Sequence, residues 1–174
     1  MLFGVLAGVV IGIGLSLLWL ISVATHPKMP ILAREPGTQV FREHADHPDD
    51  EQVPGVVALR VDGGLFFATS DALEDRIREL IHSTPELKGI VLDCKGIDFI
   101  DSQGSAKLGD VVHLAKESGI TLRLAGIKPH VSFTLGKDGI LDRIGTDKIH
   151  GNVHRAVQAQ LDASPPSADR TDQE

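Results

Sequence analysis

The fold is decided by the stretch Ile90–Val112, IVLDCKGIDFIDSQGSAKLGDVV, which holds a strand pattern and a helix pattern in immediate succession. Ile90–Cys94 is an aliphatic run interrupted by one acid, Asp93, and the chain is apolar again at Ile100. Asp101–Gly104 then leads into apolar residues at helical spacing, which are Ala106, Leu108, Val111, Val112 and Ala115. A buried strand followed directly by a helix is the repeating unit of an α/β domain.

The same alternation continues on both sides of this stretch. It predicts a hairpin of strands at residues 56–61 and 65–68, and a helix that starts at Ser70 or Asp71. It also predicts a strand at residues 120–124 with one more polar face, a short helix opened by Pro129, an edge strand at residues 148–150 and a last helix capped by Asn152 with Leu161 on its inner face. We therefore expect an α/β fold with a mostly parallel or mixed sheet of about four to five strands and about four helices.

A candidate interaction surface lies at Asp93, Asp101, Ser102, Gln103 and Gly104. In parallel sheets, functional sites gather at the carboxyl ends of the strands, where the next helices begin. A helix start also stabilises negative charge through its free N–H groups and dipole. Two interpretations of Ser102 stay open: a phosphate acceptor read by a partner, or an ordinary N-cap of a helix beginning near Gln103. Gly104 in the first turn is equally consistent with close packing alone.

Residues 1–25 contain no charged side chain. About 22 helical residues span roughly 33 Å, enough for the hydrocarbon of a bilayer, so we predict a transmembrane helix here. A signal peptide cleaved after Ser22-Val23-Ala24 is the alternative, but no basic residue precedes the apolar run, which exceeds a signal core in length. Because Lys28, Arg34 and Arg42 follow the helix, we expect the rest of the chain to be cytoplasmic.

Gly4, Gly8 and Gly12 recur every four residues within this helix. They form a smooth stripe that lets the backbone of a second helix approach closely. We therefore expect membrane partners for this helix, either other helices or a second copy of the chain.

Residues 26–52 are predicted to be a linker, because prolines interrupt any helix and the acidic cluster around Asp49 is solvated. His44 and His47 lie in this segment with several acids, but their spacing fits no standard metal-ligand frame. The domain proper is placed at residues 53–162. Residues 163–174 are polar and are predicted to be a disordered tail.

Composition excludes several classes of protein. The net charge is −7, with nearly neutral residues 55–161 between acidic flanks, so no basic face for nucleic acid is expected. The single cysteine, Cys94, rules out an internal disulfide. The chain lacks a phosphate-binding P-loop, a dinucleotide fingerprint and a nucleophile elbow, so we expect neither an enzyme nor a bound cofactor or metal.

These residues carry a resemblance to a known family. The stretch GIVLDCKGIDFIDSQG, followed by LRLAGIKPHV, resembles the STAS domain, which anti-anti-sigma factors share with the cytoplasmic tails of sulfate permease (SulP) anion transporters. GLFFATSDALEDRI is similar to the transporter branch, and the glycine-rich helix with HPKMPILAREPGTQVFRE is similar to the last membrane helix and linker of those transporters. The resemblance implies a STAS fold attached to a membrane helix.

The resemblance implies two alternative functions. The first is the regulatory and interaction domain, with the terminal helix, of a sulfate-type anion transporter at the cell membrane, whose transport core this chain does not contain. The second is a membrane-anchored, anti-anti-sigma-like signalling module switched by a kinase through Ser102, although Gln103 stands where those proteins carry a second hydroxyl residue. Partners are accordingly a transporter core, a kinase or other regulatory protein, or a second copy. Some family members bind nucleotide near this sheet edge, but no phosphate loop supports it here.

Overall fold

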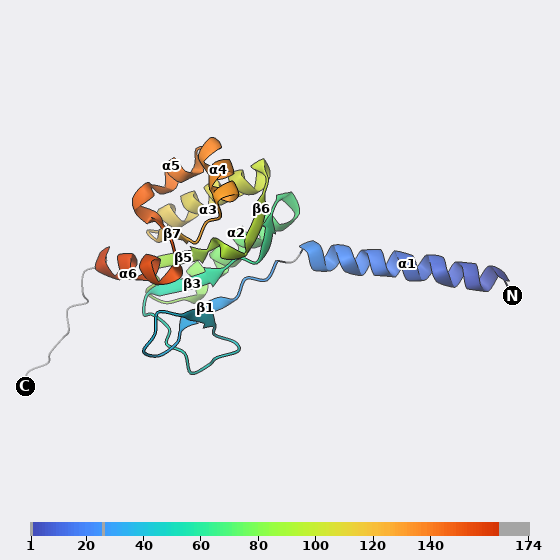
Figure 1. Ribbon diagram of the computed structural model, residues 1–174, viewed down its shortest axis with the longest axis horizontal. Coiled ribbons are helices and arrows are strands. Elements are labelled where there is room, and N and C mark those ends of the chain that lie inside the picture. The colour runs from blue at the N-terminus through green and yellow to red at the C-terminus, as the bar shows by residue number, and fades with distance from the viewer. Residues whose placement is uncertain (1, 26, 164–174) are drawn as a thin grey trace, which may run out of the picture.

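The computed structural model describes residues 2–25 and 27–163, which form an α/β domain from which one long helix projects (Figure 1). That helix, α1 (Leu2–Thr25), has exposed side chains along nearly its whole described length. The 19-residue stretch Gly4–Ser22 of this helix is long enough and apolar enough to cross a membrane. The predicted disordered tail lies outside the described residues apart from Ala163, which ends the last helix.

A mixed sheet forms the centre of the domain, as predicted. Its strands, in spatial order, are β2 (Phe41–Glu43), β1 (Ile31–Arg34), β3 (Val56–Arg60), β5 (Gly89–Asp93), β7 (Thr121–Ala125) and β8 (Ile149–His150). From β3 to β8 the strands are parallel, and β1 runs antiparallel to both of its neighbours. Within the described residues the sheet thus has six strands, more than the four or five expected, because β1 and β2 join it.

These two strands lie inside the segment that was predicted to be a linker. Leu32 and Ala33 of β1 are buried against the sheet, and the prolines that suggested irregular structure lie outside both strands. The segment after β2 is fixed by Arg42, which donates two hydrogen bonds to the buried Asp50 carboxylate at 2.7 and 2.8 Å. The hydrogen bonds from Arg42 lower the pKa of Asp50. Residues 27–52 therefore contain two strands of the sheet and a segment held by the Arg42–Asp50 ion pair, and they are not a wholly irregular linker.

A second, smaller pair of strands stands beside the main sheet. β4 (Gly63–Leu65) runs parallel to β6 (Ile97–Ile100) and does not form the predicted hairpin with the preceding strand. The following helix, α2 (Phe67–Ser83), begins earlier than Ser70. Its start is fixed by Thr69, whose hydroxyl accepts from the Phe66 N–H at 3.1 Å and donates to the Gly64 carbonyl at 2.8 Å. The predicted cap at Ser70 or Asp71 is therefore wrong.

Helices cover both faces of the main sheet (Figure 1). On one face lie α2, α3 (Ser102–Glu117), α4 (Pro129–Lys137) and α5 (Ile140–Ile144), packed on alternate strand residues such as Ile90 and Leu92. On the other face α6 (Val153–Ala163) packs on Val91 through its own apolar residues Val153, Ala156 and Val157. Two short 3-10 turns, at Cys94–Gly96 and Thr146–Lys148, complete the described elements.

The face of β7 that was predicted to be more polar is buried beneath α6. Arg123 is only 6% exposed and donates to Gln160 Oε1 at 3.0 Å, and to the carbonyls of Asp147 at 3.2 Å and Ala159 at 3.1 Å. Gln160 has room because position 89 is glycine: a Cβ there would lie 2.5 Å from the Gln160 Cδ. Gln160 takes the inner position on α6, and Leu161, predicted to be buried, is 39% exposed.

Candidate functional site

The candidate site begins at the first turn of α3, where Asp101 and not Ser102 is the N-cap. Asp101 has extended backbone angles, and its Oδ1 accepts a hydrogen bond from the Gly104 N–H at 2.7 Å. This satisfies one of the free donors at the start of the helix. Ser102 is the first helical residue, and the side chains of Ser102 and Gln103 are exposed. The capping interpretation therefore applies to Asp101, which leaves the Ser102 hydroxyl at the surface.

Gly104 holds α3 against the end of β4. A Cβ at this position would lie 2.1 Å from the Leu65 carbonyl oxygen and 2.6 Å from the Leu65 carbonyl carbon. The Asp101 N–H also donates to the Leu65 carbonyl, at 3.3 Å. Gly104 is buried, so it contributes to the placement of the surface and not to the surface itself.

Asp93 does not belong to the exposed turn, because its side chain is buried. It ends β5, is 2% exposed, and its Oδ2 accepts from Arg60 Nε at 3.1 Å. Its Oδ1 accepts from the Lys95 N–H at 3.2 Å, which starts the 3-10 turn toward β6. A carboxylate with two such donors orders the connection between β5 and β6. Of the five residues predicted to form a surface, the structure thus exposes Ser102 and Gln103, half-buries Asp101 and buries Asp93 and Gly104.

The flank of α3 is tied to α2 by ionic contacts. Lys107 lies 2.9 Å from Asp71 Oδ1 and 2.9 Å from Glu74 Oε2. The hydrogen bond from Lys107, followed by one from Arg78, lowers the pKa of Glu74. These contacts place the starts of the two helices side by side, so that the exposed first turn of α3 is held on a fixed support.

The side chains in this region differ in reactivity and in exposure. Burial raises the pKa of the Cys94 thiol to about 12, so it stays protonated at neutral pH and is a poor nucleophile or metal ligand. No group of three or more His, Cys, Asp or Glu residues within the described chain is arranged to hold a metal ion. The exposed hydroxyl and amide at the start of α3 are suited to hydrogen bonds with a partner or an anion.

The glycine stripe lies apart from this surface, on α1. For Gly4, Gly8 and Gly12, a Cβ would meet no atom of the described residues within 4 Å. The stripe is therefore open to the approach of another helix, and its role in helix packing stays a prediction.

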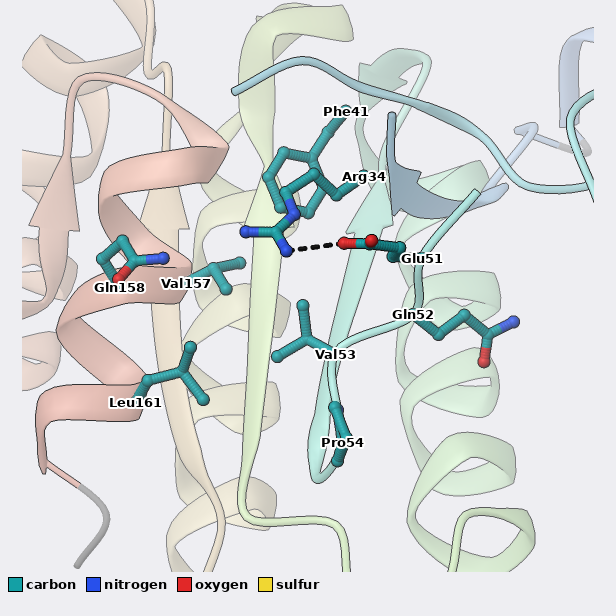
Figure 2. Close-up of a pocket in the computed structure, with 9 residues that line it drawn as sticks. All are labelled: Arg34, Phe41, Glu51, Gln52, Val53, Pro54, Val157, Gln158 and Leu161. Atoms are coloured by element: carbon teal, nitrogen blue, oxygen red, sulfur yellow. Dashed lines mark hydrogen bonds and ion pairs between the residues drawn. The ribbon is translucent and has the colours of Figure 1, made fainter. Parts of the chain in front are cut away.

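A cavity of about 350 Å³ lies between β1, residues 51–54 and α6 (Figure 2). Arg34 and Glu51 form an ion pair at 2.6 Å in its wall, and Val53, Val157 and Leu161 supply apolar lining. None of the predicted site residues lines it. The cavity is thus distinct from the α3 surface.

Comparison with known proteins identifies the domain. The family model of the STAS domain matches residues 47–156, well over half of the chain. The chain belongs to the STAS domain family. The central sheet, the Asp93 strand end and the Asp101-capped α3 described above all fall within the matched STAS region.

The curated relatives of this STAS chain include sulfate transporters. It is 32% identical to a probable sulfate transporter 4.2 of Arabidopsis thaliana over 166 residues, which cover 90% of this chain and 24% of the relative. Its fold resembles the murine Slc26a9 anion transporter in the inward-facing state, with a TM-score of 0.74 and 19% identity over 90% of this chain and 26% of that one. It also resembles the SulP transporter STAS domain of Vibrio cholerae, with a TM-score of 0.55 and 24% identity over 68% and 90% of the two chains. The chain spans about a quarter of the length of the curated relatives it matches.

The sequence predicted a helix start next to Asp101 and Ser102, where α3 begins, but not the residues that support this turn. Arg60 lies 33 positions before Asp93 and carried no local signal of pairing. Lys107 was not predicted to be part of the site, because its spacing from Asp110 and Glu117 gives no indication of contacts with α2. The one available signal was Gly104, a glycine in the first turn of a helix, which is costly unless the backbone of another element approaches closely.

Proposed function

We propose that this chain is the STAS domain, with the terminal membrane helix, of a SulP-type anion transporter, and that the domain is a cytoplasmic regulatory and interaction module. The observation that carries the proposal is the extent of the sequence match. It covers 90% of the chain in a sulfate transporter about four times longer, so it takes in more than the STAS region alone. The exposed apolar surface of α1 supports the same assignment.

The location proposed for the chain is the cell membrane. α1 rises about 36 Å over its 24 residues, against about 30 Å of bilayer hydrocarbon. Its exposed leucines, valines and isoleucines suit lipid or neighbouring helices and not water. The lysine and arginines that follow α1 favour a cytoplasmic STAS domain. The anion pathway belongs to membrane helices that pack beside α1, for which the open glycine stripe supplies a contact.

The first turn of α3 is the proposed regulatory surface. The Ser102 and Gln103 side chains are exposed, and the described residues provide no partner for the N–H groups of these two positions. The dipole of a 16-residue helix favours an anion here. Asp101 already carries a negative charge beside the turn, so a phosphate on Ser102 changes the local charge strongly and alters which partner docks.

Sulfate uptake by a chimaeric transporter tests this function. This chain replaces the matching quarter of the Arabidopsis relative, and the chimaera is expressed in cells that lack their own sulfate uptake. We expect uptake to persist, and Ser102→Glu to alter it, because the new charge stands on the contact surface. Ser102→Ala and the matched control Gln39→Glu, a charge change on an exposed loop, are expected to leave it unchanged.

Two results would contradict the proposal at different points. A chimaera that reaches the membrane but takes up no sulfate argues against the transporter role. A chimaera with wild-type uptake for Ser102→Glu, Ser102→Ala and Gln39→Glu alike retains the transporter role but removes the α3 surface from its regulation.

A further inference from the structure

Three phenylalanines on one edge of the domain have side chains that are largely exposed and not packed in the core. Phe67, Phe99 and Phe133 have exposed fractions of 67%, 56% and 75%. Outside α1, they are the three most exposed large apolar residues in the described chain. Such side chains gathered on one edge mark a contact with an apolar or interfacial partner.

The three side chains come from elements that meet at the small sheet. Phe99 belongs to β6, and Phe67 begins α2 two residues after the β4 residue Leu65, which pairs with Ile100. Phe133 lies in α4, which packs on β6. One turn before it, the His130 ring contacts the carbonyl of Asp98 at 2.8 Å. We call residues 27–30, 61–67, 94–100 and 128–133 the ribbon edge.

The ribbon edge lies beside the end of α1. Only two residues lie between Thr25 and Lys28, so their Cα atoms are at most about 11 Å apart. The Lys28 carbonyl accepts from the Asp62 N–H at 3.1 Å, which attaches the chain leaving α1 to the residue before β4. A Cβ on Gly96 would lie 2.2 Å from Asp62 Oδ1, so the turn before β6 touches the same point. Figure 1 likewise places β6 at the end of the domain nearest α1, with α6 at the far end.

The charge of the ribbon edge differs from that of the whole chain. It contains three lysines, Lys28, Lys95 and Lys128, against two aspartates, Asp62 and Asp98, in a protein of net charge −7. Lys128 pairs with Asp98, and the Lys95 side chain is exposed. Aromatic side chains flanked by lysines at the end of an apolar helix are suited to the headgroup region of a bilayer with anionic lipid.

We propose that the ribbon edge rests on the lipid headgroups of the membrane that α1 enters, with Phe67, Phe99 and Phe133 at the boundary of the acyl chains. The inference rests on the proposed role of α1 as a membrane span. A lipid surface fits better than a folded protein partner, because the phenylalanines project from three separate elements with charged residues between them. None of the cavities described in the domain is lined by any of the three.

The test measures how close a tryptophan at position 99 comes to lipid. The full chain carries one tryptophan, Trp19, so a Trp19→Phe background leaves the introduced residue as the sole emitter. In this background Phe99→Trp is compared with Leu161→Trp, which replaces an exposed apolar residue on α6 at the opposite end of the domain. Both proteins are reconstituted in vesicles of phosphatidylcholine and phosphatidylglycerol that contain brominated lipid, a quencher of tryptophan emission.

We expect brominated lipid to quench Phe99→Trp severalfold more than Leu161→Trp. Adding Lys95→Glu is expected to reduce that quenching, and the matched change Lys137→Glu, an exposed lysine at the end of α4, to leave it unchanged. Equal quenching of the two tryptophans overturns the proposal. So does an emission from Phe99→Trp that is shifted to the blue but insensitive to brominated lipid, since a protein surface then covers the edge.

Extraction of the vesicles with alkaline carbonate separates this inference from the proposed function. If the chain is released, α1 does not span the membrane, and both the membrane assignment and the ribbon-edge contact are wrong. If the chain is retained and position 99 is not quenched, only the ribbon-edge contact is wrong.

Discussion

Replacing Gly104 with alanine tests whether the close approach of α3 to β4 positions the first turn of α3, which carries Ser102 and Gln103. The added Cβ would lie 2.1 Å from the Leu65 carbonyl oxygen, and real Cβ atoms essentially never come closer than 3.0 Å to such an atom. The backbone of Leu65 must therefore move by about 0.9 Å, although Leu65 is fully buried and paired with Ile100. Overpacking of this kind costs about 1–3 kcal/mol, and the helix preference of alanine over glycine offsets about 1 kcal/mol. We expect a net loss of up to about 2 kcal/mol in the free energy of unfolding.

The matched control is the same substitution at Gly136 in α4, where the nearest atom to an added Cβ is the Leu141 Cδ1 at 3.7 Å. Here we expect a gain of up to about 1 kcal/mol from helix preference. Unfolding in urea is followed in detergent by thiol labelling of Cys94, the one cysteine of the chain, which is buried and reacts only when the domain opens. Unlike circular dichroism, this labelling does not report the helix content of α1. If Gly104→Ala unfolds at the wild-type urea concentration or is stabilised like Gly136→Ala, the reasoning about the close approach is refuted.

Three further predictions use the same kind of comparison. Asp101→Ala should lose about 1 kcal/mol of stability and Ser102→Ala close to none, as measured by Cys94 labelling in urea, and equal losses would contradict Asp101 as the N-cap. Burial and then the Arg123 guanidinium lower the pKa of His150 from 6.5, so the fold favours its neutral form, and this contribution to stability is present above pH 6.5 and lost as the pH falls below it. His150→Asn should therefore lose less stability than the wild type between about pH 7 and about pH 5, and parallel losses would show that His150 is not responsible. Gly8→Ile should weaken association of peptides of residues 1–28 in a membrane assay, whereas an unchanged association would reduce the glycine stripe to composition.

The elements that sequence predicted well are those with strong local signals. The aliphatic run of β5 is buried at every position, and α4 starts at Pro129. Asn152 accepts a hydrogen bond from the Arg155 N–H at 2.9 Å, as expected of the residue before α6. Each of these depends on residues within one turn or one strand, so the pattern alone contains the necessary information.

The elements that were missed depend on distant partners. β4 pairs with β6, more than 30 residues later, while the Gly63-Gly64 turn signal suggested a local hairpin. β1 is only four residues long and follows Pro30, so its pattern is too short to outweigh the proline; burial of Leu32 against the sheet stabilises it. A parallel or edge pairing gives no sequence signal near the strand itself.

The candidate site divides in the same way. The position of Asp101 and Ser102 at a sheet edge followed from the strand and helix on either side. The burial of Asp93 depends on Arg60 in the neighbouring strand, and the exposure of Phe99 depends on how β6 lies beside the main sheet. An apolar residue in a strand is expected to face the core, so periodicity alone assigned no surface role to the exposed phenylalanines.

Because β1 and β2 belong to the sheet, the connection between α1 and the domain is short, which raises the local concentration of the domain near α1. A flexible linker over residues 26–52 has a root-mean-square reach of about 29 Å, whereas the five residues between Thr25 and Ile31 reach about 12 Å. The volume available to the domain around the end of α1 is thus about tenfold smaller. A binding site held beside α1 consequently meets the domain at about a tenfold higher local concentration, and a weak contact is sufficient to keep the two together.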